Sequence, residues 1–259
     1  MTGLAISTLP PVIGHRGAAA YAPENTLAGF HAAKKLDCAW VEFDVRLTAD
    51  SALVVCHDDA LDRTTGGRGR ISKLPLAAIR EWDAGSRFDA RFAGERVPTL
   101  DEALSCCCAL GLGANVEIKA ERGRGPATAA AVAAGLARRA DALPPLLISS
   151  FLPDALAAAA LAMPAMPRGM LWRKLPRGWR GIAERLGCAT IHLGQADLGE
   201  TAAATVVRAG YPLLAYTVNE PARARQLFDW GVASVFSDAP DIIARALAAD
   251  RAGARMGAS

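Results

Sequence analysis

Aromatic residues are scarce in this chain, and long apolar runs are missing. Phenylalanine, tryptophan and tyrosine make up 6% of the 259 residues, although 52% of the residues are hydrophobic. We therefore expect an ample core with tightly packed, alanine-rich helices. The longest run of alanine and leucine, Ala155–Ala162, is far shorter than the roughly 20 residues that cross a bilayer. No stable association with a membrane is expected.

An excess of charge of either sign is also lacking. Lysine and arginine number 29 and aspartate and glutamate 26, which gives a formal net charge of +3, and no block rich in lysine and arginine occurs. Proteins that bind nucleic acids usually carry a far stronger basic patch. We therefore expect no nucleic-acid partner.

The six cysteines lack the spacing of a disulfide framework or of a CxxC metal site. Three of them, Cys106, Cys107 and Cys108, are consecutive in an apolar segment, and they are interpreted as small core residues in a reducing compartment. The first residues show no basic segment followed by a long apolar stretch, so no signal peptide is expected. A soluble, cytoplasmic protein is predicted.

Strand and helix patterns alternate along most of the chain. Eight strands are expected, beginning at Pro11, Trp40, Ala114, Leu146, Arg168, Ala189, Pro212 and Ala233. Eight strand–helix units predict a parallel sheet closed into a (β/α)₈ TIM barrel. An open doubly wound sheet would favour GxGxxG after the first strand, where this chain has GHRGAA. Because no domain boundary is visible, residues 1–259 are predicted to form a single domain.

Three local features complete the predicted fold. Residues 61–97 do not fit a strand–helix unit, apart from helical character at 71–80, and are interpreted as a small insertion after the second strand. Loops of this length in a compact domain are usually functional. Asn25 is expected to cap the first helix, which ends near Asp37. The tail Arg251–Ser259 is expected to fray.

The second strand, Trp40–Arg46, carries the first candidate site residues. Side chains alternate along a strand, so Val41, Phe43 and Val45 share an apolar face toward the helices. Glu42 and Asp44 then point inward together. Two buried carboxylates repel each other and lose hydration, so both stay ionised only if a cation holds them.

The third strand, Asn115–Lys119, repeats this alternation and directs Glu117 inward beside Glu42 and Asp44. An all-oxygen set of three carboxylates is what Mg²⁺ or Ca²⁺ takes, whereas Zn²⁺ more often recruits histidine or cysteine. One divalent cation is therefore predicted. The alternative is a structural network in which arginine and lysine side chains pair with these carboxylates.

Histidines and basic residues follow the same strands. His15 and His57 can each give or take a proton near neutral pH, and a pair on opposite sides of a substrate suits an in-line displacement. Arg16 and Lys119 are candidates for binding phosphate oxygens. At the C-terminal ends of barrel strands such residues are typical of an active site.

The remaining candidates are open to two interpretations. Alternation sets Cys56 opposite His57, so core packing is expected for it, and His31 is expected to be solvated. His192 either lines the pocket or lies in the core. Three aromatic residues at the ends of later strands either line the site, where they would contact the second alcohol, or only pack: Phe151, Trp172 and Tyr216.

The motifs HRG…PENT, VEFDV, HDD.LDRTT, VPTL.EAL, NVEIK, ISSF and YTVN occur in this order and spacing. With them the chain resembles the glycerophosphodiester phosphodiesterase family over nearly its whole length, and especially the cytoplasmic bacterial members. The resemblance implies a TIM barrel with a small insertion after the second strand. It also implies a divalent cation on Glu42, Asp44 and Glu117, with His15 and His57 as the acid/base pair.

The predicted function is metal-dependent hydrolysis of glycerophosphodiesters, which are small-molecule substrates, to sn-glycerol 3-phosphate and an alcohol. A first alternative is a lysophospholipase D-like phosphodiesterase, which would favour an apolar rim, whereas residues 61–97 are mostly charged and glycine-rich. A second is a non-catalytic barrel that binds a phosphate ligand. Such a barrel would be expected to have lost one of the acidic or histidine site residues, and all are present.

Overall fold

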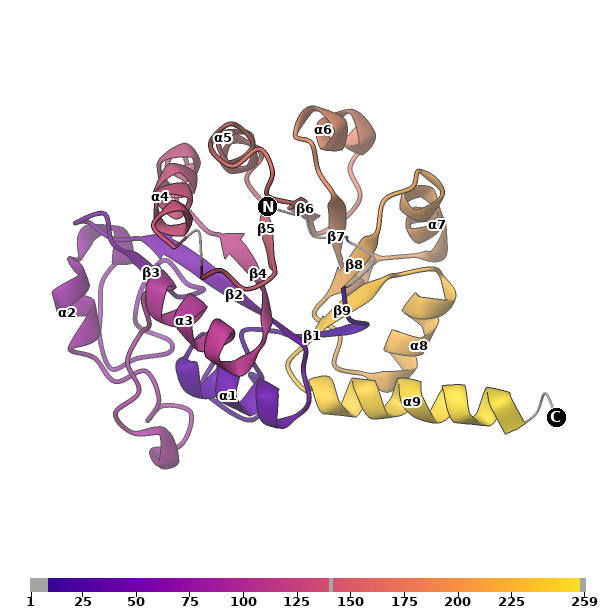
Figure 1. Ribbon diagram of the computed structural model, residues 1–259, viewed down its shortest axis with the longest axis horizontal. Helices are drawn as coiled ribbons and strands as arrows, with labels where there is room; N and C mark the ends of the chain where they lie inside the picture. Colours follow the sequence, from indigo (N-terminus) through magenta and orange to yellow (C-terminus); the bar gives the residue numbers. More distant parts are fainter. Residues whose placement is uncertain (1–8, 140–141, 257–259) are drawn as a thin grey trace.

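Eight parallel strands close into a barrel that is surrounded by helices (Figure 1). The structure is a computed structural model, and it describes residues 9–139 and 142–256. Neighbouring strands follow the order β1-β2-β4-β5-β6-β7-β8-β9, and β9 pairs with β1 to close the ring. The barrel strands are β1 (Val12–Gly14), β2 (Trp40–Leu47), β4 (Gly113–Ile118), β5 (Leu146–Ser150), β6 (Arg168–Trp172), β7 (Thr190–Gly194), β8 (Leu213–Tyr216) and β9 (Ser234–Ser237). The predicted (β/α)₈ TIM barrel is confirmed.

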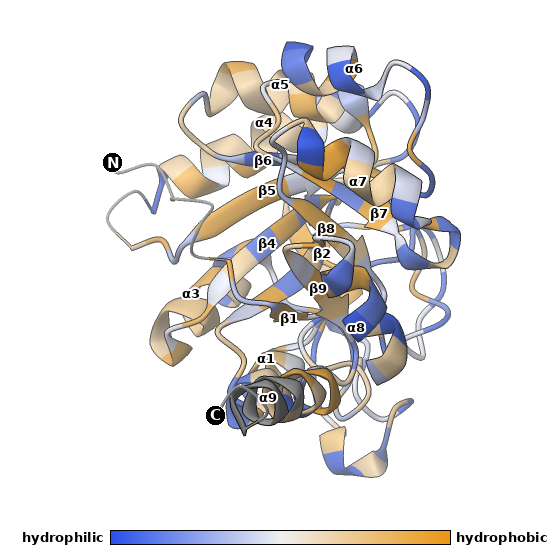
Figure 2. Ribbon diagram, turned by 90° about the vertical axis from the view of Figure 1, so that its right-hand side faces the viewer, coloured by the Kyte–Doolittle hydropathy of each residue, from blue (hydrophilic) through white to orange (hydrophobic). Residues whose placement is uncertain are grey.

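The helices lie outside the barrel. They are α1 (Leu27–Lys35), α2 (Leu76–Arg80), α3 (Leu100–Leu110), α4 (Gly125–Ala137), α5 (Pro153–Ala162), α6 (Trp179–Arg185), α7 (Glu200–Arg208), α8 (Pro221–Asp229) and α9 (Pro240–Met256), with the 3-10 helices η2 (Ile71–Lys73), η3 (Ala90–Phe92) and η4 (Gln195–Asp197). Figure 2 shows apolar residues along β5, both apolar and hydrophilic residues along β4, and hydrophilic residues on the outer turns of α6 and α8. Within the described ranges, none of these helices has both the length and the apolar character of a membrane span.

Alternation along the strands separates two apolar layers. Outward side chains such as Val41 and Phe43 pack under the helices and are fully buried. Inside the barrel, an apolar cluster consists of Ile13, Trp40, Leu147, Leu214 and Phe236. Trp40 precedes the inward carboxylates on its own strand, so the apolar filling lies nearer the N-terminal ends of the strands. The polar side chains are thereby placed toward the C-terminal ends, where barrel active sites form.

Strand register brings the polar side chains to the same level. Asp44 of β2 is paired with Glu117 of β4, two residues along from the pair of Glu42 and Asn115. On the other side of β2, Gly14 of β1 is paired with Val41, so His15 follows at the level of Glu42. The site therefore depends on backbone pairing between neighbouring strands.

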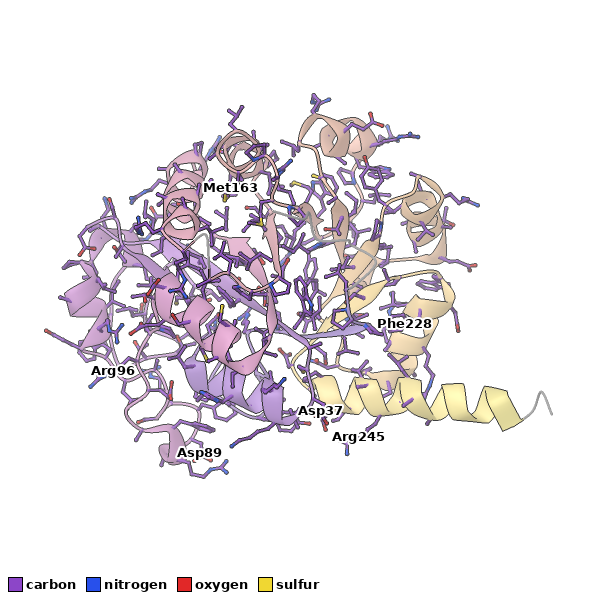
Figure 3. All side chains as sticks on the ribbon, in the orientation of Figure 1. Asp37, Asp89, Arg96, Met163, Phe228 and Arg245 are labelled. Carbon is purple, nitrogen blue, oxygen red and sulfur yellow. The ribbon has the colours of Figure 1, made fainter. Side chains whose placement is uncertain are left out.

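A short strand, β3 (Leu53–Val55), pairs antiparallel with β2 and leads into the inserted segment 61–97. This segment contains η2, α2 and η3, in agreement with the predicted helical character at 71–80. It has a small core of its own with the end of β3, made of Val54, Cys56, Leu61, Ile71, Ile79, Ala84 and Val97. The core position predicted for Cys56 is confirmed. Figure 3 places Asp89 and Arg96 at the outer edge of the insertion.

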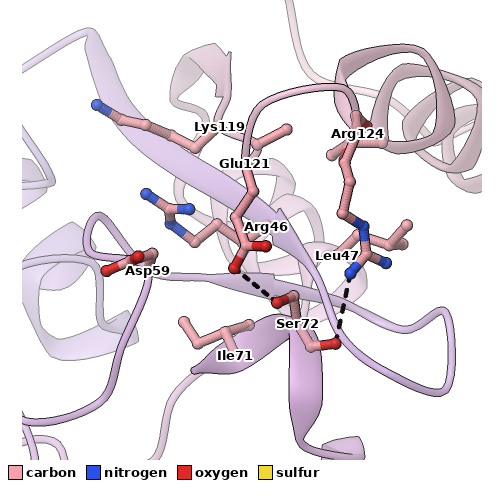
Figure 4. A pocket seen from close by; sticks show the side chains of 10 residues that line it. Arg46, Leu47, Asp59, Ile71, Ser72, Lys119, Glu121 and Arg124 are labelled. Atoms are coloured by element: carbon pink, nitrogen blue, oxygen red, sulfur yellow. Dashed lines mark hydrogen bonds between the residues drawn. The ribbon is translucent and has the colours of Figure 1, made fainter. Parts of the chain in front are cut away.

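Polar contacts fix the insertion to the loop after β4 (Figure 4). The Ser72 hydroxyl donates a hydrogen bond to Glu121 Oε1 over 2.6 Å, and Arg124 Nη1 donates one to the Ser72 carbonyl oxygen over 3.4 Å. A small crevice beside these contacts is also lined by Lys119. The insertion is therefore attached next to a strand that carries candidate site residues.

Three local predictions were wrong. Thr26, not Asn25, caps α1, because its hydroxyl accepts a hydrogen bond from the Gly29 amide. Helix α9 continues to Met256, well into the tail that was expected to fray; residues 257–259 lie outside the described residues. Cys107 is a core residue as predicted, whereas Cys108 faces outward on α3 and is exposed, since consecutive helical residues point to different sides.

The turn after β1 brings backbone against backbone. A Cβ atom on Gly14 would lie 2.1 Å from the Gly17 carbonyl oxygen, and one on Gly17 would lie 2.6 Å from the carbonyl carbon of Gly29. Gly17 has a φ of +93°, which favours glycine, and Arg16 has a φ of +51°, which is uncommon for other residues. This turn orients Arg16 at the barrel mouth.

Gly14→Ala is expected to lower the free energy of unfolding by about 1–3 kcal/mol, the usual cost of forcing atoms into a packed region. The added methyl group would overlap the Gly17 carbonyl group and displace the turn at Arg16. Urea unfolding followed by circular dichroism measures the change.

Gly135→Ala in α4 is the matched control, because its Cβ would meet Leu100 and Leu53 at the ordinary distances of 3.5 and 3.6 Å. Alanine favours a helix interior over glycine, so this variant should keep or raise the stability, by up to about 1 kcal/mol. Wild-type stability of Gly14→Ala would show that the turn relaxes freely, contrary to this expectation.

Candidate active site

A cavity of about 390 Å³ opens at the C-terminal ends of the strands, and most of the predicted site residues line it. These are His15, Arg16, Glu42, His57, Glu117, Lys119, Phe151 and Tyr216. Asp44 lies beneath the surface of the cavity, where it contacts Arg16 and Lys119. Segments that are far apart in the sequence thus meet in one place.

Two residues of the later strands, His192 and Trp172, were open to two interpretations. His192, for which pocket and core positions were both considered, has features of both: it borders the cavity, yet it is fully buried and bonded to the Thr190 hydroxyl over 2.9 Å. Trp172 does not line the cavity but packs against the main core, so of its two interpretations packing is the one that holds. Alternation along β6 instead directs Leu171 and Arg173 to the cavity. His31 is exposed on α1, as predicted.

Glu42, Asp44 and Glu117 form a compact acidic group. Each offers one carboxylate oxygen, and these three oxygens lie within 4.8 Å of one another. All three side chains are buried. Lys119 Nζ lies 3.3 Å from Asp44 Oδ1 and 2.9 Å from Glu117 Oε1, so part of the negative charge is already neutralised.

Backbone and amide groups hold two of the carboxylates in position. The Arg16 backbone amide donates a hydrogen bond to Glu42 Oε2 over 3.0 Å. The Asn25 side chain donates to Asp44 Oδ2 over 2.9 Å, and its amide oxygen accepts from the Asp44 backbone over 3.1 Å. Asn25, expected to be a helix cap, is thus a hydrogen-bond partner of Asp44 in the acidic group. Its φ of +58° turns it toward β2.

The three carboxyl groups differ in protonation because their surroundings differ. Burial, followed by repulsion from Asp44 and Glu117, raises the pKa of Glu42 well above its usual value. Burial and Asp44 raise the pKa of Glu117 to about 7. Burial also acts on Asp44, but Lys119 and Arg16 outweigh it and lower its pKa to about 2. Without a further cation, the group therefore retains protons near neutral pH.

A divalent cation fits this group. The donors are all carboxylate oxygens, which Mg²⁺ and Ca²⁺ prefer. Lys119 and Arg16 supply two positive charges to the three carboxyl groups, with Lys119 Nζ 2.9 Å from the buried Glu117 Oε1. Three buried carboxylates are costly unless further positive charge balances them.

A carboxylate orients each of the two histidines. His15 Nδ1 lies 2.7 Å from Asp238 Oδ1, just after β9, and the Asn219 side chain donates to Asp238 Oδ2 over 2.7 Å. Burial alone would raise the pKa of Asp238, but the hydrogen bonds from His15 and Asn219 lower it. An ionised Asp238 only accepts hydrogen bonds, so the proton lies on His15 Nδ1. His15 Nε2 lies 3.9 Å from Glu42 Oε2.

His57 is held in the same way on the other side of β2. Its Nδ1 lies 2.7 Å from Asp58 Oδ1, and Arg63 Nε donates to Asp58 Oδ2 over 2.6 Å. Arg63 also donates two hydrogen bonds to Glu24, over 2.6 and 2.7 Å, and Glu24 accepts one from Arg16 Nη1 over 2.7 Å. A continuous network thus links His57 to Arg16 through the first residues of the insertion.

The protonation of His57 follows from these contacts. Arg63 and His57 keep the pKa of Asp58 well below its usual value, so Asp58 is ionised. Burial lowers the pKa of His57. At neutral pH the ring is therefore uncharged, with its proton on Nδ1 toward Asp58 and the lone pair of Nε2 free to accept a proton.

Aromatic residues form the opposite wall. Lys119 Nζ lies 5.5 Å from the centre of the Phe151 ring, and Phe151 meets Tyr216 edge to face, with ring centres 5.7 Å apart. The Tyr216 hydroxyl is buried and has no hydrogen-bond partner in the part of the chain that the structure describes.

The model of the glycerophosphoryl diester phosphodiesterase family matches residues 15–242, which contain every element of this cavity. The chain belongs to the glycerophosphoryl diester phosphodiesterase family. A glycerophosphodiester phosphodiesterase of Bacillus subtilis strain 168 is 30% identical over 246 residues, which cover 89% of this chain and 84% of that relative. Matches to relatives from Bacillus subtilis and Caldanaerobacter subterraneus are 48% and 50% identical but span only 38% and 37% of those relatives' length.

Solved structures of the family agree with this assignment. A phosphodiesterase of Oleispira antarctica, in complex with the product sn-glycerol-3-phosphate, has a TM-score of 0.89 and 39% identity and covers 93% of this chain and 98% of its own. A structure from Silicibacter pomeroyi has a TM-score of 0.82 and 27% identity and covers 92% of this chain and 93% of its own.

Several residues that support or line the site were not predicted from the sequence. Glu24 and Arg63 stand in the family motifs PENT and LDRTT, but nothing in the pattern indicated that they bond to each other. Asp238 follows the last strand and is 223 residues away from His15. Arg173 follows directly after β6 and was not predicted as a site residue, although alternation along this strand directs it to the cavity.

The raised pKa of Glu117 predicts how stability depends on pH. A carboxyl group whose pKa is raised on folding stabilises the fold while it is protonated, and this contribution is lost as the pH rises through the folded-state pKa. The metal-free protein should therefore lose stability between about pH 4.5 and pH 7. A bound divalent cation requires the ionised carboxylates, so its stabilising effect should grow over the same interval.

Thermal unfolding with saturating Mg²⁺ or Ca²⁺ and with chelator tests this expectation. The difference in Tm should be larger at about pH 8 than at about pH 5, and Glu117→Gln should flatten the pH dependence of the metal-free protein. Glu81→Gln, at an exposed position of the insertion, is the matched control and should behave as wild type. A difference in Tm that is equal at both pH values would contradict this assignment.

Proposed function

We propose that the protein hydrolyses glycerophosphodiesters to sn-glycerol 3-phosphate and an alcohol, with a divalent cation and two histidines. The observation that carries the proposal is that two oriented histidines border one cavity together with Glu42 and Glu117, two members of a group of three buried carboxylates, in a chain of this family. The relative in complex with sn-glycerol-3-phosphate, similar over 93% of the chain, supports the same product.

The proposed metal ligands are Glu42, Asp44 and Glu117, and the proposed cation is Mg²⁺ or Ca²⁺. When bound, such a cation neutralises developing negative charge and polarises a phosphoryl oxygen. The residues of the chain then supply the binding and the proton transfers. Arg16 and Lys119 border the cavity beside the carboxylates, where they can bind the anionic phosphodiester.

The two histidines suit an in-line displacement at phosphorus. A hydroxyl group attacks phosphorus, one imidazole accepts its proton, and the other donates a proton to the oxygen of the leaving alcohol as the P–O bond breaks. His57 has the free Nε2 lone pair that a base needs, and Asp238 can stabilise a positive charge on His15. Phe151 and Tyr216 are proposed to contact the substrate on the opposite wall.

We further propose that residues 1–259 act as one catalytic domain, with segment 61–97 as an insertion, and that the protein works in the cytoplasm. All six cysteines are free, which suits a reducing compartment. The proposed partner is a small-molecule diester, with neither nucleic acid nor a stable membrane contact.

An assay of sn-glycerol 3-phosphate release from several headgroup diesters tests the activity. Release from water-soluble glycerophosphodiesters supports the proposal. Cleavage of lysophospholipids alone would favour the lysophospholipase D-like alternative. Tight binding of the diester without turnover, in metal-loaded protein, would favour the non-catalytic alternative.

His15→Ala and His57→Ala are each expected to lower kcat by about 10²–10⁴, the usual contribution of one general acid or base. Both side chains lie at the rim, so the fold should stay intact. Steady-state kinetics and circular dichroism measure the two effects. His31→Ala, on the exposed face of α1, is the control and should be nearly silent; a wild-type kcat for His57→Ala would make His57 structural.

Exhaustive chelation is expected to abolish turnover, and Mg²⁺ or Ca²⁺ should restore it, because the three carboxylates are proposed to bind substrate only through a cation. Glu42→Gln should raise the metal concentration needed for half-maximal activity. Undiminished activity after complete chelation, verified by elemental analysis, would rule out the metal-dependent reaction.

A further inference from the structure

Arg173 is a basic residue of the cavity that has no partner in the described part of the chain. It follows β6 directly, lines the cavity together with Leu171, and makes neither an ion pair nor a hydrogen bond through its guanidinium group there. The other basic residues of the cavity are engaged: Arg16 contacts Glu24 and Asp44, and Lys119 contacts Asp44 and Glu117. An exposed, unpaired arginine at the mouth of a substrate cavity is available to a ligand.

The strand order places Arg173 away from the acidic group. In the ring of eight strands, β6 is four strands from β1 and therefore lies across the barrel from His15, while the metal-site carboxylates lie on β2 and β4. The lining carboxylates Glu42 and Glu117 lie on β2 and β4, whereas Phe151, Tyr216 and Thr217 come from the ends of β5 and β8. If the phosphate of the diester binds beside the carboxylates, the alcohol group that extends toward β6 meets the positive charge of Arg173.

Neighbouring groups support a polar contact at this place. The Tyr216 hydroxyl is buried without a hydrogen-bond partner in the described residues, so it can bond to a ligand. Burial and Glu117 raise the pKa of Tyr216, and Arg173 opposes this rise, which places its charge within electrostatic reach of the hydroxyl.

An aromatic site for a quaternary ammonium group is not built here. Such a site needs open ring faces around the cation. One face of Phe151 already lies against Lys119 Nζ, and its contact with Tyr216 is edge to face. A cationic headgroup would therefore meet Arg173 without compensating attraction, and like charges at close range are disfavoured.

We propose that Arg173 selects the leaving alcohol by its charge, so that alcohols with an anionic group are preferred to neutral ones, and neutral ones to those with an ammonium group. This inference rests on the proposed phosphodiesterase activity and adds a preference among its substrates. A carboxylate or phosphate on the leaving alcohol would accept the hydrogen bonds of the guanidinium group, and a hydroxyl group would bond to Tyr216.

Three diesters that differ in one terminal group test the proposal. They are the sn-glycerol 3-phosphate esters of glycolate, ethylene glycol and ethanolamine, three two-carbon alcohols that end in a carboxylate, a hydroxyl and an ammonium group. The wild-type protein, saturated with metal, should show kcat/KM falling in that order, by about 10-fold or more from the first to the last. Because Arg173 is exposed, added salt should reduce this ratio.

Variants separate the effect of Arg173 from the intrinsic reactivity of the three alcohols. Arg173→Met should lower the ratio of kcat/KM for the carboxylate diester to kcat/KM for the ammonium diester by about 10-fold. Arg173→Glu should make the ammonium diester the better substrate of the two. Lys174→Met is the matched control: Lys174 is the adjacent residue, but it is ion-paired with Asp197 and lies outside the cavity, so its ratio should equal that of wild type.

Each outcome decides between the alternatives. Equal ratios in the wild-type protein and in folded Arg173→Met would overturn the charge selection and leave the phosphodiesterase activity standing. A change of equal size in Lys174→Met would also overturn it, since a general surface charge would then be responsible. Absence of turnover of all three diesters by folded, metal-loaded wild-type protein would overturn the proposed function, and this inference with it.

Discussion

Repulsion among three buried carboxylates is the constraint on which the rest of the site depends. Glu42, Asp44 and Glu117 are brought together by strand register and cannot move apart without breaking the β2–β4 pairing. Lys119 and Arg16 offset part of the charge from the cavity side, and Asn25 holds Asp44 from the α1 side. The acidic group is thereby kept in place at the cost of raised pKa values, and a cation relieves this cost.

Alternation and topology explain which parts were predictable from the sequence. The pattern of β2 determines on its own that Glu42 and Asp44 point away from the helix-covered face, and β4 repeats that pattern for Glu117. The eight strand–helix units allowed few arrangements other than a closed barrel. The position of the acidic group therefore depends on local periodicity, and the positions of both histidines depend on the strand ends that they follow; a sequence displays both features directly.

Contacts across the barrel mouth were not predictable in this way, because they depend on the distance between loops. Asp238 pairs with His15, and Arg63 pairs with Glu24, only because the folded chain brings their loops together. The spacing of these residues in the sequence does not indicate either contact. At Trp172 the residue type alone allowed two positions, and alternation along β6 decides between them, because it directs Trp172 to the core and Arg173 to the cavity. The general preference of asparagine for the N-cap position did not decide the role of Asn25. The neighbouring Thr26 is the N-cap of α1, and the Asn25 side-chain amide bonds to Asp44 instead.

The hydrogen bond between His15 and Asp238 joins the first barrel strand to the last, at the seam where β1 meets β9. During synthesis on the ribosome, one of the two histidines therefore remains unoriented until the end of the barrel has emerged. An incomplete chain that ends before Asp238 lacks the carboxylate that orients His15. The order of the elements thus delays assembly of the complete site until the ring has closed.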